Sequence, residues 1–324
     1  VLHELGKYPL EEIDYAELDP LLIEAVQEFP TSLTADEMSD PRLRVELVDG
    51  RLLVREKQGE AGRYDLVIVN LPYPSTLLLN RFYTAEFFAM VRELLTENGI
   101  VVTAMPASLS YLSDEQRDLN AMAYFTLKDA FPYVMPIPGD LTLWLASRSV
   151  ELPAWNVDAL VERWESRGLD TRLVTAPHVR LRLDQRYLDW FWTSLGVEEK
   201  EAKLNRDLHP LGLFYGLSYW NSLFSPGLLR FFTLAGRLNL WFLVIPLMGC
   251  ALLYGAIAKL TGKGHGAVIP VAVATTGFVG MAADLVIIFS FQSLYGHVYH
   301  WIGLLLTAFM GGLAAGAWLM NRRA

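Results

Sequence analysis

Long charge-free runs near the C-terminal end of this 324-residue chain constrain its fold more than any other feature. Residues 240–258 and 298–320 contain no Asp, Glu, Lys or Arg, and residues 267–291 contain only Asp284. A helix needs about 20 mostly apolar residues to cross a bilayer, and soluble domains rarely bury three such runs in succession. The sequence therefore predicts an all-α transmembrane segment over residues 238–324, with helices at about 240–258, 267–291 and 298–320. Membrane lipid is accordingly an expected partner.

The charge distribution separates this segment from the rest of the chain. The whole chain has a net charge of −9, whereas residues 211–324 carry +5 and residues 1–210 carry −14. Such an asymmetry is typical of two parts in two different solvents. No nucleic-acid partner is expected, because the acidic part offers no basic stripe for phosphates. The single cysteine, Cys250, excludes a disulfide within the chain.

Two polar features interrupt the apolar half. Residues 211–237 are apolar and aromatic but are broken by Ser225-Pro226, which favours an interfacial amphipathic segment over a membrane span. Asp284 is the one acid at the predicted membrane depth, where a carboxyl group is costly unless it is paired. It is therefore either a functional intramembrane polar residue or a packing residue satisfied by neighbouring hydroxyl and amide groups.

Residues 1–150 alternate between strand and helix patterns. The residues 64–70, YDLVIVN, form a continuous apolar run of the kind that is typical of a buried parallel strand. The alternation predicts an α/β fold with a doubly wound sheet, whose ligands bind at the carboxyl ends of the strands. Residues 151–210 are expected to be the helical C-terminal part of this soluble domain. Strands are expected at 13–18, 43–48, 64–70 and 100–104, with a closing pair within 133–147, and helices at 20–29, 81–96 and 119–131.

Candidate binding residues follow the first two of these strands. Glu17 ends the first strand, where an acid in nucleotide-binding folds accepts hydrogen bonds from the ribose, about 20 residues after a glycine-rich phosphate loop. Counting back from Glu17 puts such a loop before Val1, so we expect the chain to be a fragment that lacks the first strand and this loop. Asp49 and Gly50 end the second strand, where they form either a base contact or a plain turn.

The central strand is followed by Asn70 and a loop that two prolines stiffen. This loop is the candidate substrate loop, with the residues Pro72, Pro74, Ser75 and Thr76.

Several short motifs occur in a characteristic order: LGKYP (5–9), ELDP (17–20), DPR (40–42), DGR (49–51), PYPST (72–76), NRDLHP (205–210) and GFVGMAAD (277–284). Together they resemble the spermidine synthase (polyamine aminopropyltransferase) family. The resemblance is strongest to its membrane-embedded bacterial branch, in which such a domain is fused to transmembrane helices.

The resemblance implies a methyltransferase-like Rossmann sheet that binds decarboxylated S-adenosylmethionine, or S-adenosylmethionine, as donor substrate and needs no metal. It implies transfer of an aminopropyl group to a small-molecule amine. In this family Glu17 would bind the ribose, and Asp49 with Gly50 the adenine. The resemblance also implies a multi-pass protein of the bacterial inner membrane with a cytoplasmic soluble domain, and it allows a homo-oligomer.

The amine side of the family's site is altered in this chain. An Asp-x-x-Asp pair of the family falls on Asn70 and Tyr73, and neither an amide nor a phenol accepts a proton readily at neutral pH. Three functions follow as alternatives. In the first, the chain is a transferase for an acceptor other than the usual diamine, and an apolar amine would suit Tyr73 and Met105. Otherwise it is a catalytically inactive nucleoside-binding module, or a transporter-associated module that uses Asp284.

Overall fold

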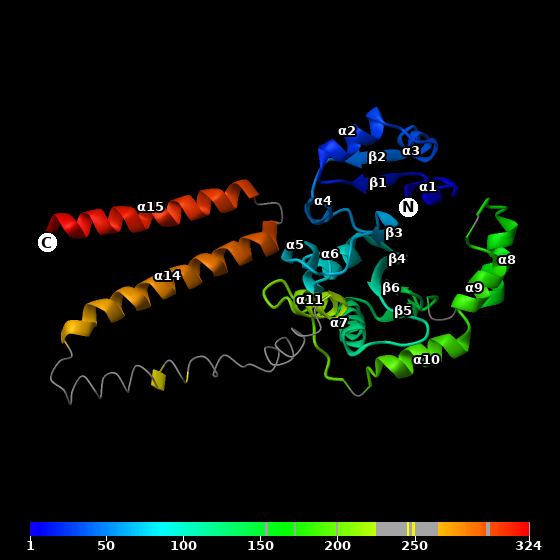
Figure 1. The fold of residues 1–324 in the computed structure, drawn as a ribbon. Coiled ribbons are helices and arrows are strands. Elements are labelled where there is room, and N and C mark those ends of the chain that lie inside the picture. Colours follow the sequence, from blue (N-terminus) through cyan, green and yellow to red (C-terminus); the bar gives the residue numbers. More distant parts are fainter. Residues whose placement is uncertain are drawn as a thin grey trace. The chain divides into compact units, whose positions relative to one another are not determined.

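The computed structural model describes residues 1–152, 155–171, 173–198, 200–224, 245, 248–249, 265–295 and 299–323. The chain divides into two compact units, Val1–Tyr219 and Trp220–Ala324 (Figure 1). Apart from three positions, the first predicted membrane helix, 240–258, lies outside the described residues.

The strands of the first unit form two sheets. In the smaller one, β1 (Ile13–Ala16) pairs in parallel with β2 (Leu43–Glu46). The larger one has the order β3-β4-β6-β5, in which β3 and β4 are parallel and the other two pairs are antiparallel. Its strands are β3 (Tyr64–Val69), β4 (Leu95–Pro106), β5 (Tyr133–Ile137) and β6 (Leu141–Ser147).

This arrangement confirms the predicted α/β class, with a mixed sheet, but the single sheet that we expected is divided. Side chains rather than backbone hydrogen bonds connect β1 to β3. The Tyr64 hydroxyl donates to the Asp14 carboxylate at 2.6 Å, and Arg63 lies 3.4 Å from the same oxygen. The candidate binding residues still follow the carboxyl ends of their strands: Glu17 after β1, Asp49 after β2 and Asn70 after β3.

Helices connect successive strands from β1 to β5, whereas β6 follows β5 directly, and Figure 1 shows the order of the elements along the chain. Both α6 and α7 pack against β4 and against each other, which places them on one face of the larger sheet. Among the described residues of this unit the helices are α1 (Leu2–Gly6), α2 (Pro20–Glu28), α3 (Ser32–Met38), α4 (Gly50–Glu56), α5 (Leu77–Asn80), α6 (Ala85–Leu94), α7 (Asp114–Ala130), α8 (Val157–Ser166), α9 (Ala176–Arg182) and α10 (Gln185–Leu195). Helix α11 (Leu211–Phe224) begins in this unit and continues past its last residue, Tyr219.

Three predicted boundaries were wrong, and side-chain caps explain the two that are helix starts. The helix expected at 81–96 starts at Ala85, because the Thr84 hydroxyl accepts a hydrogen bond from the Phe87 amide and caps it. Helix α7 starts five residues earlier than expected, because Ser113 and Gln116 form a capping box. Helix α6 ends at Leu94, and β4 begins at Leu95, five positions before the strand that we expected at 100–104.

The core of this unit corrects one sequence interpretation. Met105, which we placed beside the acceptor, is fully buried in the same hydrophobic cluster as Phe88, Leu119 and Trp144. A side chain surrounded in this way contributes packing and leaves no surface for a ligand.

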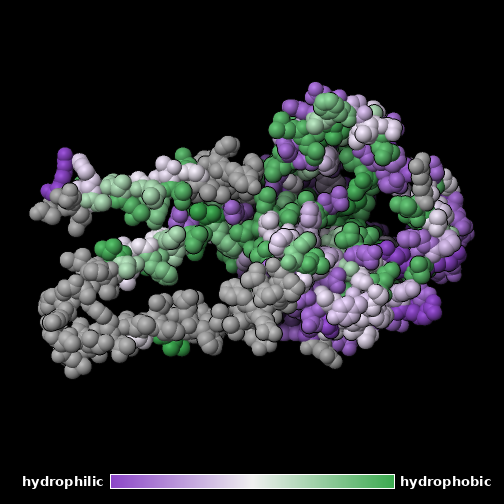
Figure 2. Space-filling view, viewed as in Figure 1, coloured by the Kyte–Doolittle hydropathy of each residue, from purple (hydrophilic) through white to green (hydrophobic). Residues whose placement is uncertain are grey.

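The second unit contains two long apolar helices, α14 (His265–Tyr295) and α15 (Tyr299–Arg323), which contact each other. Figure 2 shows apolar side chains along much of both helices. Among the described residues one helix is long and apolar enough to cross a membrane, over Val273–Gln292, with a mean hydropathy of 1.8; the apolar part of α15, Leu306–Leu319, is shorter. An all-α segment of several spans is therefore not confirmed. Asp284 lies within α14 and is partly exposed.

Candidate functional site

Glu17 follows the end of β1 and is held there by two hydrogen bonds. Its carboxylate accepts from the Tyr15 hydroxyl at 2.7 Å and from the Asp19 backbone amide at 3.0 Å. Burial alone would raise the pKa of Glu17, but these hydrogen bonds outweigh it and lower the pKa, whereas burial and the neighbouring carboxylate raise the pKa of Tyr15 to about 12. Glu17 is therefore an oriented, ionised acceptor with lone pairs left for a ligand.

Asp49 lies after β2, where it caps α4. One carboxylate oxygen accepts from the backbone amides of Arg51 and Leu52 at 3.0 and 3.2 Å, and the other accepts from Arg81 at 2.9 Å. Gly50 begins α4, and a methyl group there would meet Ala16 and Phe82 only at ordinary contact distance. Both Asp49 oxygens thus have protein partners, and the predicted contact of Asp49 and Gly50 with adenine stays a prediction.

A second buried ion pair links this helix start to a distant segment. The Arg51 guanidinium donates to both oxygens of Asp207, at 2.8 and 2.6 Å, and the Thr84 hydroxyl donates to the same carboxylate at 2.8 Å. The Arg51 and Asp207 side chains are 8% and 10% exposed. The sequence analysis missed this pair, because 156 residues separate its members.

We predict that Asp207→Ala destabilises the fold by about 3–5 kcal/mol, since it leaves the Arg51 guanidinium buried without its partner. Chemical denaturation monitored by circular dichroism measures the effect. The matched control is Arg206→Ala, which breaks only a longer and more exposed pair with Glu86 and should cost less than about 1 kcal/mol. Equal effects of the two substitutions would contradict the prediction.

The loop after β3 brings together the predicted substrate residues. Asn70 is exposed at the strand end, Pro74 is buried, and the Thr76 hydroxyl caps α5 by accepting from the Leu79 amide at 3.2 Å. The hydroxyl of Tyr83 lies 2.7 Å from the Leu71 carbonyl and 2.9 Å from that of Pro72, and donates to them. The loop, residues 71–76, is therefore fixed at its start by Tyr83 and at its end by the cap of α5.

Tyr73 is only partly buried, and its ring packs edge to face against Tyr219 with the ring centroids 5.3 Å apart. Burial raises the pKa of Tyr73, and the neighbouring Tyr219 adds to this effect. The phenol therefore stays protonated at neutral pH. No side chain between Asn70 and Thr76 is a carboxylate, so the loop itself supplies no base for an amine.

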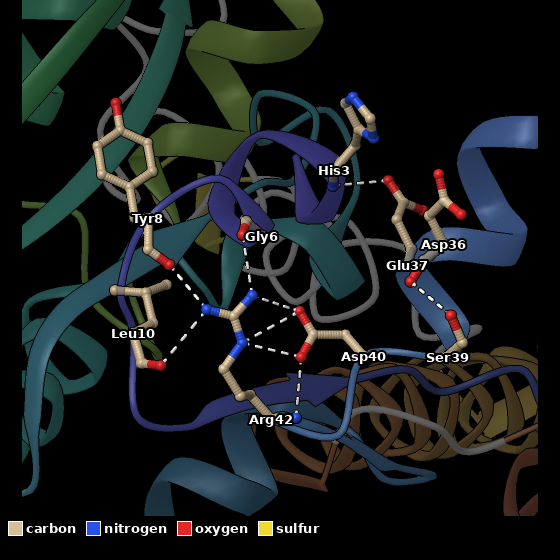
Figure 3. A network of polar contacts seen from close by, with 9 residues as sticks. All are labelled: His3, Gly6, Tyr8, Leu10, Asp36, Glu37, Ser39, Asp40 and Arg42. Carbon is tan, nitrogen blue, oxygen red and sulfur yellow. Dashed lines mark hydrogen bonds and ion pairs between the residues drawn. The ribbon is translucent and has the colours of Figure 1, made fainter. Parts of the chain in front are cut away.

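A cavity of about 240 Å³ lies elsewhere, between α1, α3 and the amino ends of β1 and β2. Beside it, the Arg42 guanidinium donates to the Asp40 carboxylate and to the carbonyls of Gly6 and Tyr8 (Figure 3). The hydrogen bonds that the Arg42 side chain and backbone amide donate to the Asp40 carboxylate lower the pKa of Asp40 to about 2. The cavity is at the opposite ends of β1 and β2 from Glu17 and Asp49, so it is separate from the predicted site. Among the described residues, no three His, Cys, Asp or Glu side chains come together as a metal site would require.

Comparison with known proteins finds relatives of the amino-terminal part of the chain. Residues 1–152 match the model of the spermine/spermidine synthase domain. The chain is similar to the polyamine aminopropyltransferase of Alkaliphilus oremlandii, with 31% identity over 53% of this chain and 60% of that protein. The enzyme of the same name from Korarchaeum cryptofilum is 36% identical over 32% of this chain and 30% of that protein. The chain thus spans less than two thirds of the length of these relatives.

A spermidine synthase structure from Thermotoga maritima is also similar, with 18% sequence identity and a TM-score of 0.44, over 60% of this chain and 64% of that one.

Proposed function

We propose that this chain transfers an aminopropyl group from a decarboxylated S-adenosylmethionine-type donor to an amine without a second positive charge. In support, residues 1–152 match the model of the spermine/spermidine synthase domain. Glu17, as an oriented and ionised acceptor, is the candidate ribose ligand. The observation that carries the proposal on the acceptor is the loop after β3, which holds Asn70 and Tyr73 and has no carboxylate.

The proposed chemistry is a displacement at carbon. A neutral amine nitrogen attacks the propyl carbon bound to the positively charged sulfur of the donor. A carbon–nitrogen bond forms, the carbon–sulfur bond breaks with its electron pair going to sulfur, and the product ammonium loses a proton. A diamine would bring a second cation, whose burial without a carboxylate is costly. The loop therefore suits an amine with an uncharged, apolar body.

We predict that transfer to a monoamine depends on the acceptor's own titration. Since the Tyr73 phenol stays protonated, kcat/KM should rise about tenfold per pH unit up to the pKa of an alkyl amine, about 10. The measurement is product formation from a monoamine and a diamine between pH 6 and 10. A profile that is already level below pH 8, or a preference for the diamine, would contradict the proposal.

Restoring the family's two acids is a direct test of which residues face the amine. We predict that Asn70→Asp with Tyr73→Asp raises diamine affinity, measured by calorimetry, because each carboxylate can pair with one ammonium. Since Tyr73 packs against the core cluster, the double variant should also lose thermal stability, and Asn70→Asp alone should not. Asn98→Asp is the control, because it adds an acid at an exposed position near the start of β4. Diamine affinity equal to that of the wild-type chain would refute this assignment of the loop.

The missing carboxylates also favour a second candidate function. A domain that retained Glu17 but lacks a base could bind the nucleoside without turnover. Donor binding with no product from any amine would establish this candidate in place of the transferase.

We further propose that the second unit is membrane-embedded, with α14 as a span and lipid as its partner. In support, Val273–Gln292 is 20 residues long and none of its hydrophobic window is buried.

We predict that the full chain stays in the membrane fraction after alkaline extraction. Val279→Arg with Val286→Arg should reduce this retention, because a charge at the centre of a span costs about 2.5–3.5 kcal/mol. Both valines are more than 60% exposed, so unchanged retention would mean that α14 is a surface helix and not a span.

A further inference from the structure

The first turn of α11 is fastened by two buried asparagines. The Asn205 side-chain oxygen accepts from the Gly212 amide at 3.0 Å, and the Asn80 side-chain oxygen accepts from the Leu213 amide at 2.9 Å. These amides have no partner within a helix and need one outside it. Asn205 also donates to the carbonyl of Tyr83 at 2.9 Å. The start of α11 is thus tied to Tyr83, the residue whose hydroxyl binds the first two carbonyls of the loop 71–76.

One turn further, α11 lies directly on the backbone of that loop. A methyl group added to Gly216 would lie 2.3 Å from the Pro74 carbonyl oxygen and 2.8 Å from its carbon. A methyl group on Gly212 would lie 2.5 Å from the side-chain oxygen of Asn80. Contacts this short cannot form without a shift of the loop or the helix, so glycine at these positions is what permits the close approach.

The same helix then presents Tyr219 to the loop. Its ring meets Tyr73 at an interplanar angle of 78°, which is a favourable arrangement for two aromatic rings. The next residue, Trp220, is 47% exposed. Tyr219 therefore contacts the loop, whereas its neighbour Trp220 on the same helix is about half exposed.

We propose that α11 is part of the acceptor site. Gly216 is a positioning residue that fixes the loop 71–76, and Tyr219 is a specificity-determining residue that, together with Tyr73, limits the bulk of the amine that enters. The specificity role rests on the proposed aminopropyl transfer, whereas the positioning role does not.

Hydrogen exchange of the full chain tests the positioning role without any substrate. In Gly216→Ala the amides of the non-proline residues in 71–80 should exchange at least about tenfold faster, because a methyl group forced into a packed contact displaces the loop. The amides of α7 serve as an internal reference and should not change. Trp220→Ala is the matched control on the same helix, and it should leave exchange in the loop unchanged.

If Gly216→Ala speeds exchange in α7 equally, the variant has lost global stability, and Tyr219→Ala decides instead, since it removes a contact without adding bulk. Faster exchange confined to residues 71–80 then supports the positioning role, and unchanged exchange there overturns it.

Turnover with a series of amines tests the specificity role. Tyr219→Ala should raise the ratio of kcat/KM for a bulky monoamine to that for a small one at least about tenfold, with Tyr219→Phe close to the wild-type chain and Trp220→Ala unchanged. An unchanged ratio in Tyr219→Ala overturns this role alone. If no amine accepts the group, both the specificity role and the proposed function are overturned. The hydrogen-exchange measurement still tests the positioning role in that case.

Discussion

The bidentate ion pair between Arg51 and Asp207 connects the parts of the molecule on which the candidate site depends. Arg51 lies in the first turn of α4, directly after Asp49 and Gly50, and Asp207 lies in the segment that leads to α11. A buried charge is tolerated only with a partner, so each of these two groups requires the other. This ion pair therefore links the start of α4, which directly follows Asp49, to the segment that leads into α11.

Hydrogen bonds between uncharged groups connect the segment around this ion pair to the loop 71–76. Asn205, two residues before Asp207, binds both the first turn of α11 and the carbonyl of Tyr83. Tyr83 in turn binds the loop carbonyls, and Gly216 allows α11 to rest on Pro74. The loop is thus held by nearby residues, Tyr83 and the cap of α5, and by Asn205 and Gly216, which lie more than a hundred positions further along the chain. It contains no carboxylate.

Local patterns were sufficient to predict the strands and the residues that follow them. Apolar runs bounded by polar residues located β1, β2 and β3, and the rule that ligands bind at strand carboxyl ends singled out Glu17, Asp49 and Asn70. Caps that depend on one or two side chains, such as Ser113 with Gln116, moved helix boundaries by several residues. The role of α11 could not be predicted, because the same apolar sequence that suggested an interfacial segment also suits a helix packed on a protein loop. Glycines at 212 and 216 indicate close packing, but no local pattern identifies Pro74 as the partner.

We propose that this chain moves an aminopropyl group to an amine that has no second charge. The most direct measurement uses the full chain, a decarboxylated S-adenosylmethionine donor labelled in the propyl group, and a monoamine and a diamine of equal length in competition. We expect the label to appear on the monoamine in a one-to-one ratio with released methylthioadenosine. Label found mainly on the diamine, or no release of methylthioadenosine with either amine, would contradict it.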